Sequence, residues 1–142
     1  MIELKIRAAF ENLLTGRVNE LLQDYEFKIA PIEFSSFLGG SSVVPVLRLS
    51  ECERSEKERI IRVDAYSLTV SLYVPETVDS ERDVYAYGAA IGTALAEDPT
   101  LGGVVDRGVI TGKKYVPPKK PYCGDGWELI LTLRLTVEGM TV

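Results

Sequence analysis

The chain has 142 residues, of which 46% are hydrophobic and 26% are charged, and its formal net charge at pH 7 is -5. These values are typical of a globular domain with a buried core, so we expect a single domain over residues 1–142. The negative charge argues against nucleic-acid binding over the whole surface, and no apolar run reaches the about 18 residues that a membrane helix needs. The first residues also lack the apolar core of a secretory signal, which indicates a cytoplasmic product.

Apolar residues recur at helical spacing from Ile2 to about Leu22, with charged residues between them. This pattern predicts an amphipathic helix that covers one face of a sheet. Gly16 lies inside it and indicates either a break or a close contact.

The next stretch, Tyr25 to Ser42, reads as a loop because it contains Pro31 and a Gly-Gly-Ser-Ser run. It is nevertheless apolar, with Phe27, Ile29, Ile32, Phe34, Phe37 and Leu38. Two interpretations stay open. The loop either covers the chain's own core or contacts another chain.

A strand is predicted over Val43–Leu49, and Pro45 places it at a sheet edge or at its own start. The mixed-charge run Ser50–Arg59 then reads as a solvated hairpin turn. The following strand, Ile60–Val74, changes the parity of its apolar residues near Ala65. Because side chains alternate with period two, this change predicts a β-bulge there, or two halves that face different surfaces.

The chain is organised around the stretch from Asp79 to Gly103, which reads as a helix with a firm end. Asp79 or Ser80 is expected to cap the first turn through its side-chain oxygen, and Pro99 ends the helix. The face turned to the core is expected to hold Val84, Tyr87, Gly88, Ile91, Ala94 and Leu95.

A strand over Val104–Thr111 follows, then a proline-rich insertion over Gly112–Gly126. Trp127–Val137 alternates apolar and polar residues throughout and is expected to be a central strand. The order is therefore α-β-β-α-β-β. It predicts an α+β fold with a mostly antiparallel four-stranded sheet and two main helices packed on one side.

Little in the chain points to catalysis. Histidine is absent, which removes the commonest general base near neutral pH. Cys52 and Cys123 are isolated and fall short of the about four ligands of a structural zinc site. They are expected to be free thiols, although a disulfide between them stays open. Glu97 and Asp98 lie side by side at a helix end, where Asp98 is expected to form the turn. We predict no enzyme, no catalytic residue, no metal and no cofactor.

The most unusual stretch runs from Lys113 to Tyr122, where lysines, tyrosines and prolines cluster in an acidic protein. Three interpretations stay open: contact with an acidic protein partner, contact with nucleic acid, or a solvated hairpin loop. Together with the apolar loop, it supplies the candidate interface residues Phe34, Phe37, Leu38, Lys113, Lys114, Tyr115, Pro117, Pro118, Lys119, Lys120 and Tyr122.

The second half of the chain resembles a known family. The turn Asp98-Pro99-Thr100-Leu101-Gly102-Gly103, the strand Val104–Thr111, an insertion, and the closing strand Trp127–Gly139 follow one another. This succession resembles the tail terminator and minor tail proteins of long-tailed bacteriophages and prophages. The resemblance covers about 40 residues closely, and the first half matches only in the order of its elements.

The resemblance implies a structural phage tail assembly protein without enzymatic activity. Such proteins form a ring, typically a hexamer, at the end of the tail tube and join it to the head connector. The implied partners are other copies of this chain, the tail tube protein and the head-tail connector protein, without a membrane or specific nucleic acid. The implied location is the virion tail or neck, after synthesis in the host cytoplasm. The alternative is a small cytosolic ligand-binding domain or enzyme with a pocket beneath the central helix.

Overall fold

The computed structural model describes residues 1–25, 29–34, 45–57, 61–119 and 126–140, and at 45–46, 48–57, 61–62 and 139–140 it describes the backbone alone. The strands are β1 (Pro45–Lys57), β2 (Ile61–Pro75), β3 (Arg107–Val116) and β4 (Gly126–Met140). They form a four-stranded sheet in the order β1-β2-β4-β3, and each neighbouring pair is antiparallel. The predicted α+β class with an antiparallel sheet is confirmed.

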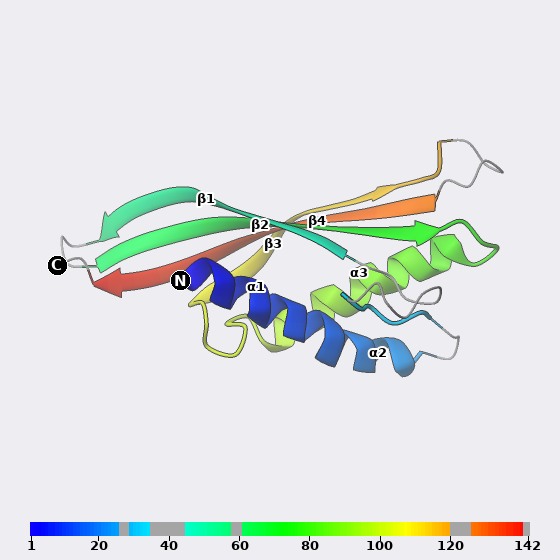
Figure 1. The fold of residues 1–142 in the computed structure, drawn as a ribbon, viewed down its shortest axis with the longest axis horizontal. Helices are drawn as coiled ribbons and strands as arrows, with labels where there is room; N and C mark the ends of the chain where they lie inside the picture. Colours follow the sequence, from blue (N-terminus) through cyan, green and yellow to red (C-terminus); the bar gives the residue numbers. More distant parts are fainter. Residues whose placement is uncertain (26–28, 35–44, 58–60, 120–125, 141–142) are drawn as a thin grey trace.

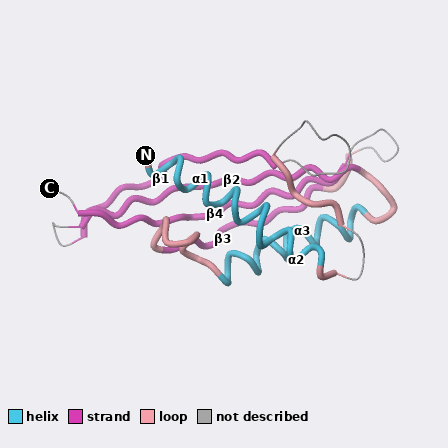
Figure 2. Tube along the Cα trace, turned by 60° about the horizontal axis from the view of Figure 1, so that its bottom comes forward, coloured by secondary structure: helices cyan, strands magenta, loops and turns pink. Residues whose placement is uncertain are grey.

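Helices cover one side of this sheet (Figures 1 and 2). The first helical segment consists of α1 (Ile2–Leu13), a π-helical turn η1 (Leu14–Val18) and α2 (Asn19–Gln23). The second is α3 (Ser80–Glu97). The predicted helix from Ile2 is therefore confirmed. The break expected at Gly16 takes the form of the π-helical turn, and Gly16 makes no close contact, because a Cβ there would have no neighbour within 4 Å.

The core lies between the sheet and the helices. On the central strand β4, the side chains of Leu129, Leu131, Leu133 and Leu135 are all 0% exposed. They share one face, as the alternation predicted, and β4 lies between β2 and β3 as a central strand should. The helices contribute Ile6, Phe10, Leu14, Val18, Leu22, Val84, Tyr87, Ile91, Ala94 and Leu95 to the same core.

The β-bulge predicted within β2 near Ala65 was wrong, and the irregularity found beside it belongs to the neighbouring strand β1. Glu51 pairs with Tyr66 and Glu53 pairs with Ala65, so Cys52 of β1 is the extra residue. Strand β2 keeps an unbroken register with β4 from Ile61 to Pro75. The parity change instead means that the apolar residues before and after Ala65 lie on opposite faces of β2, as the alternative interpretation predicted. Val63 lies opposite Glu138, whereas Tyr66 and Leu68 are buried in the core.

Three predicted boundaries were wrong. Strand β1 continues to Lys57, so most of the run predicted as a turn over Ser50–Arg59 is strand. An edge strand tolerates such charges, because its outer side meets water and the charges discourage aggregation. Strand β3 begins at Arg107 and continues to Val116, so the start of the predicted insertion over Gly112–Gly126 is also strand.

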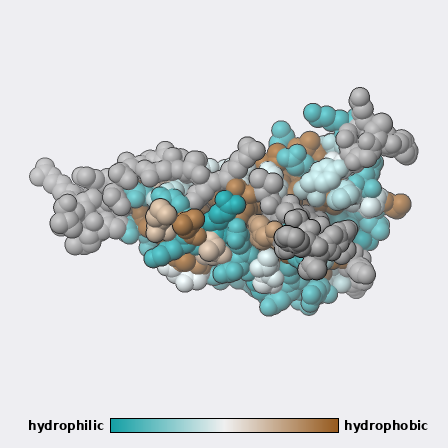
Figure 3. All heavy atoms as spheres, viewed as in Figure 1, coloured by the Kyte–Doolittle hydropathy of each residue, from teal (hydrophilic) through white to brown (hydrophobic). Residues whose placement is uncertain are grey.

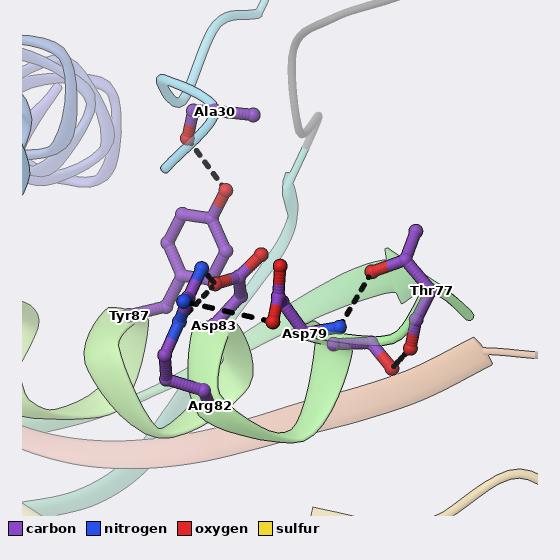
Figure 4. Close-up of polar contacts among 7 residues, drawn as sticks. Ala30, Thr77, Asp79, Arg82, Asp83 and Tyr87 are labelled. Carbon is purple, nitrogen blue, oxygen red and sulfur yellow. Dashed lines mark hydrogen bonds and ion pairs between the residues drawn. The ribbon is translucent and has the colours of Figure 1, made fainter. Parts of the chain in front are cut away.

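Helix α3 starts without the expected side-chain cap (Figure 4). The backbone N–H of Asp79 donates to Thr77 Oγ1 at 3.3 Å, and the Ser80 hydroxyl donates to Thr77 O at 2.9 Å. The Asp79 carboxylate instead forms an ion pair with Arg82 at 3.6 Å. The two predicted caps therefore turn away from the helix amides, one toward Arg82 and the other toward the preceding turn.

The chain leaves α3 through a tight turn that begins at Asp98. The Asp98 carboxylate accepts hydrogen bonds from the backbone N–H of Gly102 at 2.9 Å and from the Thr100 hydroxyl at 3.2 Å. Leu101, Gly102 and Gly103 have φ values of 51°, 69° and 89°. Glycine adopts such values freely, whereas Leu101 is held there by a side chain that is only 3% exposed. The six-residue phrase that carries the family resemblance is thus one folded unit.

Candidate functional site

Part of the predicted lysine-rich loop belongs to the edge strand β3. Thr111 is an extra residue in β3, because Ile110 pairs with Leu133 and Gly112 already pairs with Thr132. Beyond this bulge, Lys113 and Tyr115 lie opposite Leu131 and Leu129, on the helix side of the sheet. The bulge thereby turns Tyr115 toward α3, and the lysines stand on a strand with fixed register.

Tyr115 joins an aromatic cluster between the sheet and α3. Its ring lies edge-on to Tyr85 with ring centres 4.8 Å apart, and Tyr85 lies 5.9 Å from Trp127. The Tyr115 hydroxyl occupies the place where a Cβ of residue 88 would be, so Gly88 is required for this contact. Tyr85 is 43% exposed and donates to Glu81 at 3.1 Å, which raises the pKa of Tyr85. Large aromatic side chains with part of the ring in water are typical of contact surfaces.

Positive charge gathers along the same edge. Arg107, Lys113, Lys114 and Lys119 are all exposed, and no acidic residue occurs between Arg107 and Lys119. The Lys113 ammonium lies 6.0 Å from the centre of the Tyr115 ring, at the limit of a cation–π contact. We call the set formed by Tyr85, Arg107, Lys113, Lys114, Tyr115, Lys119 and Trp127 the β3 surface.

The connection after β3 begins beside the outer face of the sheet. A hollow of about 190 Å³ there is lined by Tyr73, Val116, Pro117, Lys119, Gly126 and Glu128. Pro117 is exposed and Pro118 is half-buried. Lys120 and Tyr122, which were also predicted for the interface, lie outside the described residues.

A larger open groove of about 520 Å³ runs between the second half of α3 and β3. Its lining consists of Gly92, Leu95, Ala96, Pro99, Asp106, Arg107, Gly108, Val109 and Ile110. At one end the Gly108 N–H donates to Pro99 O at 2.7 Å, so the chain's own backbone occupies the start of the strand edge. The Asp106 carboxylate accepts the backbone N–H of Glu138 at 2.5 Å. The groove is mainly apolar, and its carboxylate already has a structural partner.

The described part of the apolar loop packs on the chain's own core. Ile32 is 0% exposed, and Phe34 is half-buried against the core. Asn19 accepts the Ile32 N–H at 2.8 Å and donates to Ile32 O at 2.9 Å. The Tyr87 hydroxyl donates to Ala30 O at 2.5 Å (Figure 4). Over these residues, the interpretation as a covering loop is confirmed. Phe37 and Leu38, which were the remaining candidates for a contact with another chain, lie outside the described residues.

The two neighbouring carboxylates have separate structural roles. Glu97 accepts two hydrogen bonds from Arg17, at 2.8 Å and 3.0 Å, which lowers the pKa of Glu97 and raises that of Arg17. This pair joins the π-helical turn to the end of α3. Asp98 forms the turn described above, as the sequence predicted. Within the described ranges, no three residues among His, Cys, Asp and Glu are grouped closely enough to hold a metal ion.

Sequence reasoning missed Tyr85 and Trp127 as members of the β3 surface. Tyr85 falls between the residues of the predicted buried face of α3, which was a signal that its side chain turns outward. Trp127 is the first apolar residue in the alternation of the predicted central strand, which favours a place in the core, yet it is half-buried.

Figure 3 shows one face of the molecule, where the described residues present scattered hydrophobic spots among hydrophilic ones.

The chain matches none of the models of known protein families, and a comparison with curated proteins finds no similar sequence. Among the helices in the described ranges, none is long and apolar enough to cross a bilayer.

Proposed function

We propose that this chain is a structural component of a phage or prophage tail. In this proposal it is a tail terminator, whose copies form a ring at the end of the tail tube and join it to the head connector. The observation that carries the proposal is the β3 surface: a strip of exposed basic residues along a sheet edge, beside a partly exposed aromatic cluster, in a chain whose net charge is -5. Such a strip suits contact with an acidic protein surface, because charge guides the approach and aromatic rings supply contact area.

The turn from Asp98 to Gly103 adds support. Its hydrogen bonds and three consecutive positive φ values explain why Asp98, Gly102 and Gly103 are needed there. The six residues that carry the resemblance thus form one turn, between the central helix and the edge strand, whose backbone conformation requires these residue types.

The proposed partners are other copies of the chain, the tail tube protein and the head-tail connector protein. A ring, expected to be a hexamer, needs two different patches on each copy. A net acidic ring would also repel DNA that passes through its lumen. The protein would act in the virion tail or neck after synthesis in the host cytoplasm, with no enzymatic step.

The test has two parts. Light scattering after size exclusion, over a range of protein and salt concentrations, should find a ring-sized or concentration-dependent species. Electron microscopy should then show added density at one end of tail tubes mixed with the protein. A chain that neither self-associates nor binds tail tubes at any salt concentration would contradict the proposal.

The groove between α3 and β3 supports a second candidate, a small ligand-binding α+β domain or enzyme. An apolar cleft of about 520 Å³ lies within the size range of small-molecule sites. A fragment screen by NMR tests it, because a ligand in the groove would shift the amide signals of Gly92 and Gly108 together. Signals that stay unmoved across an apolar fragment library would count against this candidate.

A further inference from the structure

The sheet ends in two edges that no other strand covers in the part of the chain that the structure describes. In the order β1-β2-β4-β3, the outer strands are β1 and β3 (Figure 1). Edge strands carry N–H and C=O groups that have no partner in the sheet, and these groups can pair with a strand from another chain.

The direction of the strands determines which contacts continue the sheet. Because neighbouring strands alternate in direction and the sheet has four, β1 and β3 run in opposite directions. A second copy that places its β1 beside β3 therefore extends the same antiparallel alternation. The helices of both copies then lie on one side of the joined sheet. This contact uses a different patch on each copy, which is the arrangement that builds rings.

Charge distinguishes this contact from the competing one. Two β3 edges related by a two-fold axis would also be antiparallel, but they would bring Arg107, Lys113 and Lys114 of one copy against the same residues of the other. Like charges opposite one another destabilise a strand pair. Strand β1 instead has balanced charge over Pro45–Lys57, with Arg48, Arg54 and Lys57 against Glu51, Glu53 and Glu56. A second copy's β1 is thus the better neighbour for the basic edge.

We propose that β3 of one copy and β1 of a second copy form an antiparallel strand pair that extends the sheet from copy to copy. The part of the β3 edge that can pair with another strand lies after Gly108, because the outward N–H of Gly108 already donates to Pro99 O. Val109 is 40% exposed, on the face of the sheet away from the helices, opposite Arg134. This inference rests on the proposed function, because it names the contact through which the ring would form.

Disulfide cross-linking tests the pairing, since a disulfide forms only when two Cα atoms come within about 7 Å. The native thiols are first removed by Cys52→Ser and Cys123→Ser. Val109→Cys is then combined with Arg48→Cys or with Ser50→Cys. Ser50 pairs with Ser67, which pairs with Arg134, the residue opposite Val109. Arg48 pairs with Thr69, which pairs with Thr132, so it lies one row further along the same face. As a matched control, Val109→Cys is combined with Thr93→Cys, an exposed position on α3.

After mild oxidation, at least one β3–β1 double variant should form a ladder of dimers, trimers and higher species, while each single variant and the Thr93 control stay monomeric. A dimer from Val109→Cys alone would overturn the proposal in favour of the two-fold contact. The absence of every β3–β1 cross-link, with or without association in solution, would also overturn it. Circular dichroism of each variant verifies the fold.

Tail-tube binding separates this inference from the proposed function. Ladders without any binding to tail tubes would keep the strand pairing and contradict the tail role. Binding to tube ends without β3–β1 cross-links would keep the tail role and contradict the pairing.

Discussion

The hydroxyl of Tyr87 connects the middle of α3 to the segment that precedes Ile32. Its side chain is buried, and burial, with a smaller effect of Asp83, raises the pKa of Tyr87 above its ordinary value of 10.0. A tyrosine whose folded pKa is raised stabilises the fold fully below its unfolded pKa, and this contribution is lost as the pH rises through the folded pKa.

Tyr87→Phe should therefore lower the free energy of unfolding near pH 7 by about 0.5–1.5 kcal/mol, because the bond to Ala30 O disappears. Above pH 10 the native protein should lose stability and the variant should lose less. Urea unfolding at several pH values measures both effects. Tyr85→Phe is the control, since its hydroxyl lies at the exposed surface. Equal effects of the two substitutions would contradict the role given to Tyr87.

Two glycines of α3 lie four residues apart and differ in their surroundings. A Cβ at Gly92 would have no neighbour within 4 Å, whereas a Cβ at Gly88 would collide with the Tyr115 hydroxyl. Glycine in a helix interior costs about 1 kcal/mol relative to alanine.

Gly92→Ala should raise the free energy of unfolding by about 1 kcal/mol. Gly88→Ala should gain less or lose stability, because the Tyr115 ring must move away from Tyr85. Urea unfolding gives the free energies, and near-ultraviolet circular dichroism reports the aromatic cluster. The interpretation fails if Gly88→Ala stabilises as much as Gly92→Ala and leaves the aromatic signal unchanged.

At the scale of elements, the loop and the first helical segment are joined by one side chain. Asn19 follows the π-helical turn, and its side chain makes two hydrogen bonds to the backbone of Ile32. Its amide N–H also donates a third hydrogen bond to Thr15 O at 3.2 Å, within the helical segment. The side chain of Asn19 therefore satisfies both the N–H and the C=O of Ile32.

Asn19→Ala should cost about 1–3 kcal/mol of unfolding free energy, since two half-buried hydrogen bonds are lost. Hydrogen exchange should become faster at the Ile32 amide. Asn12→Ala, at an exposed position of α1, is the matched control and should change little. Unchanged exchange at Ile32 would show that other contacts hold the loop.

The elements that sequence reasoning predicted well are those whose pattern is set by one buried face. The alternation of β4 and the spacing along α3 arise because each element meets the core on a single side. The bounds of the two edge strands were predicted wrongly, because the side chains of an edge strand contact water as well as the core. The charged end of β1 reads as a turn, and the bulge at Thr111 breaks the alternation of β3.

The candidate site could be predicted only in part. Lys113, Lys114 and Tyr115 stand out by composition, but the bulge that turns Tyr115 toward Gly88 depends on the register with β4. The ion pair between Arg17 and Glu97 joins residues 80 positions apart, so no local sequence pattern predicts it. Contacts of this kind follow from the packing of whole elements, which a single sequence does not display.

At the scale of the whole molecule, one core connects the sheet to both helical segments. Leu133→Ala, at a 0% exposed position of the central strand, should therefore cost about 2–5 kcal/mol. Unfolding followed by far-ultraviolet circular dichroism and by Trp127 fluorescence should give one coincident transition. Ile130→Ala, on the other face of the same strand, is the control with the smaller expected loss. Two separate transitions would contradict the expectation of a single domain.

The long sheet also gives the molecule two distinguishable poles. Strand β4 has 15 residues and spans about 50 Å at the usual rise per residue. Its Gly126 end lies beside the basic end of β3, and Met140 lies at the opposite end, beyond the start of α1 (Figure 1). A gold particle or fluorophore attached after Met140 would therefore mark one pole. Micrographs of labelled assemblies would reveal whether every subunit points the same way along the assembly axis.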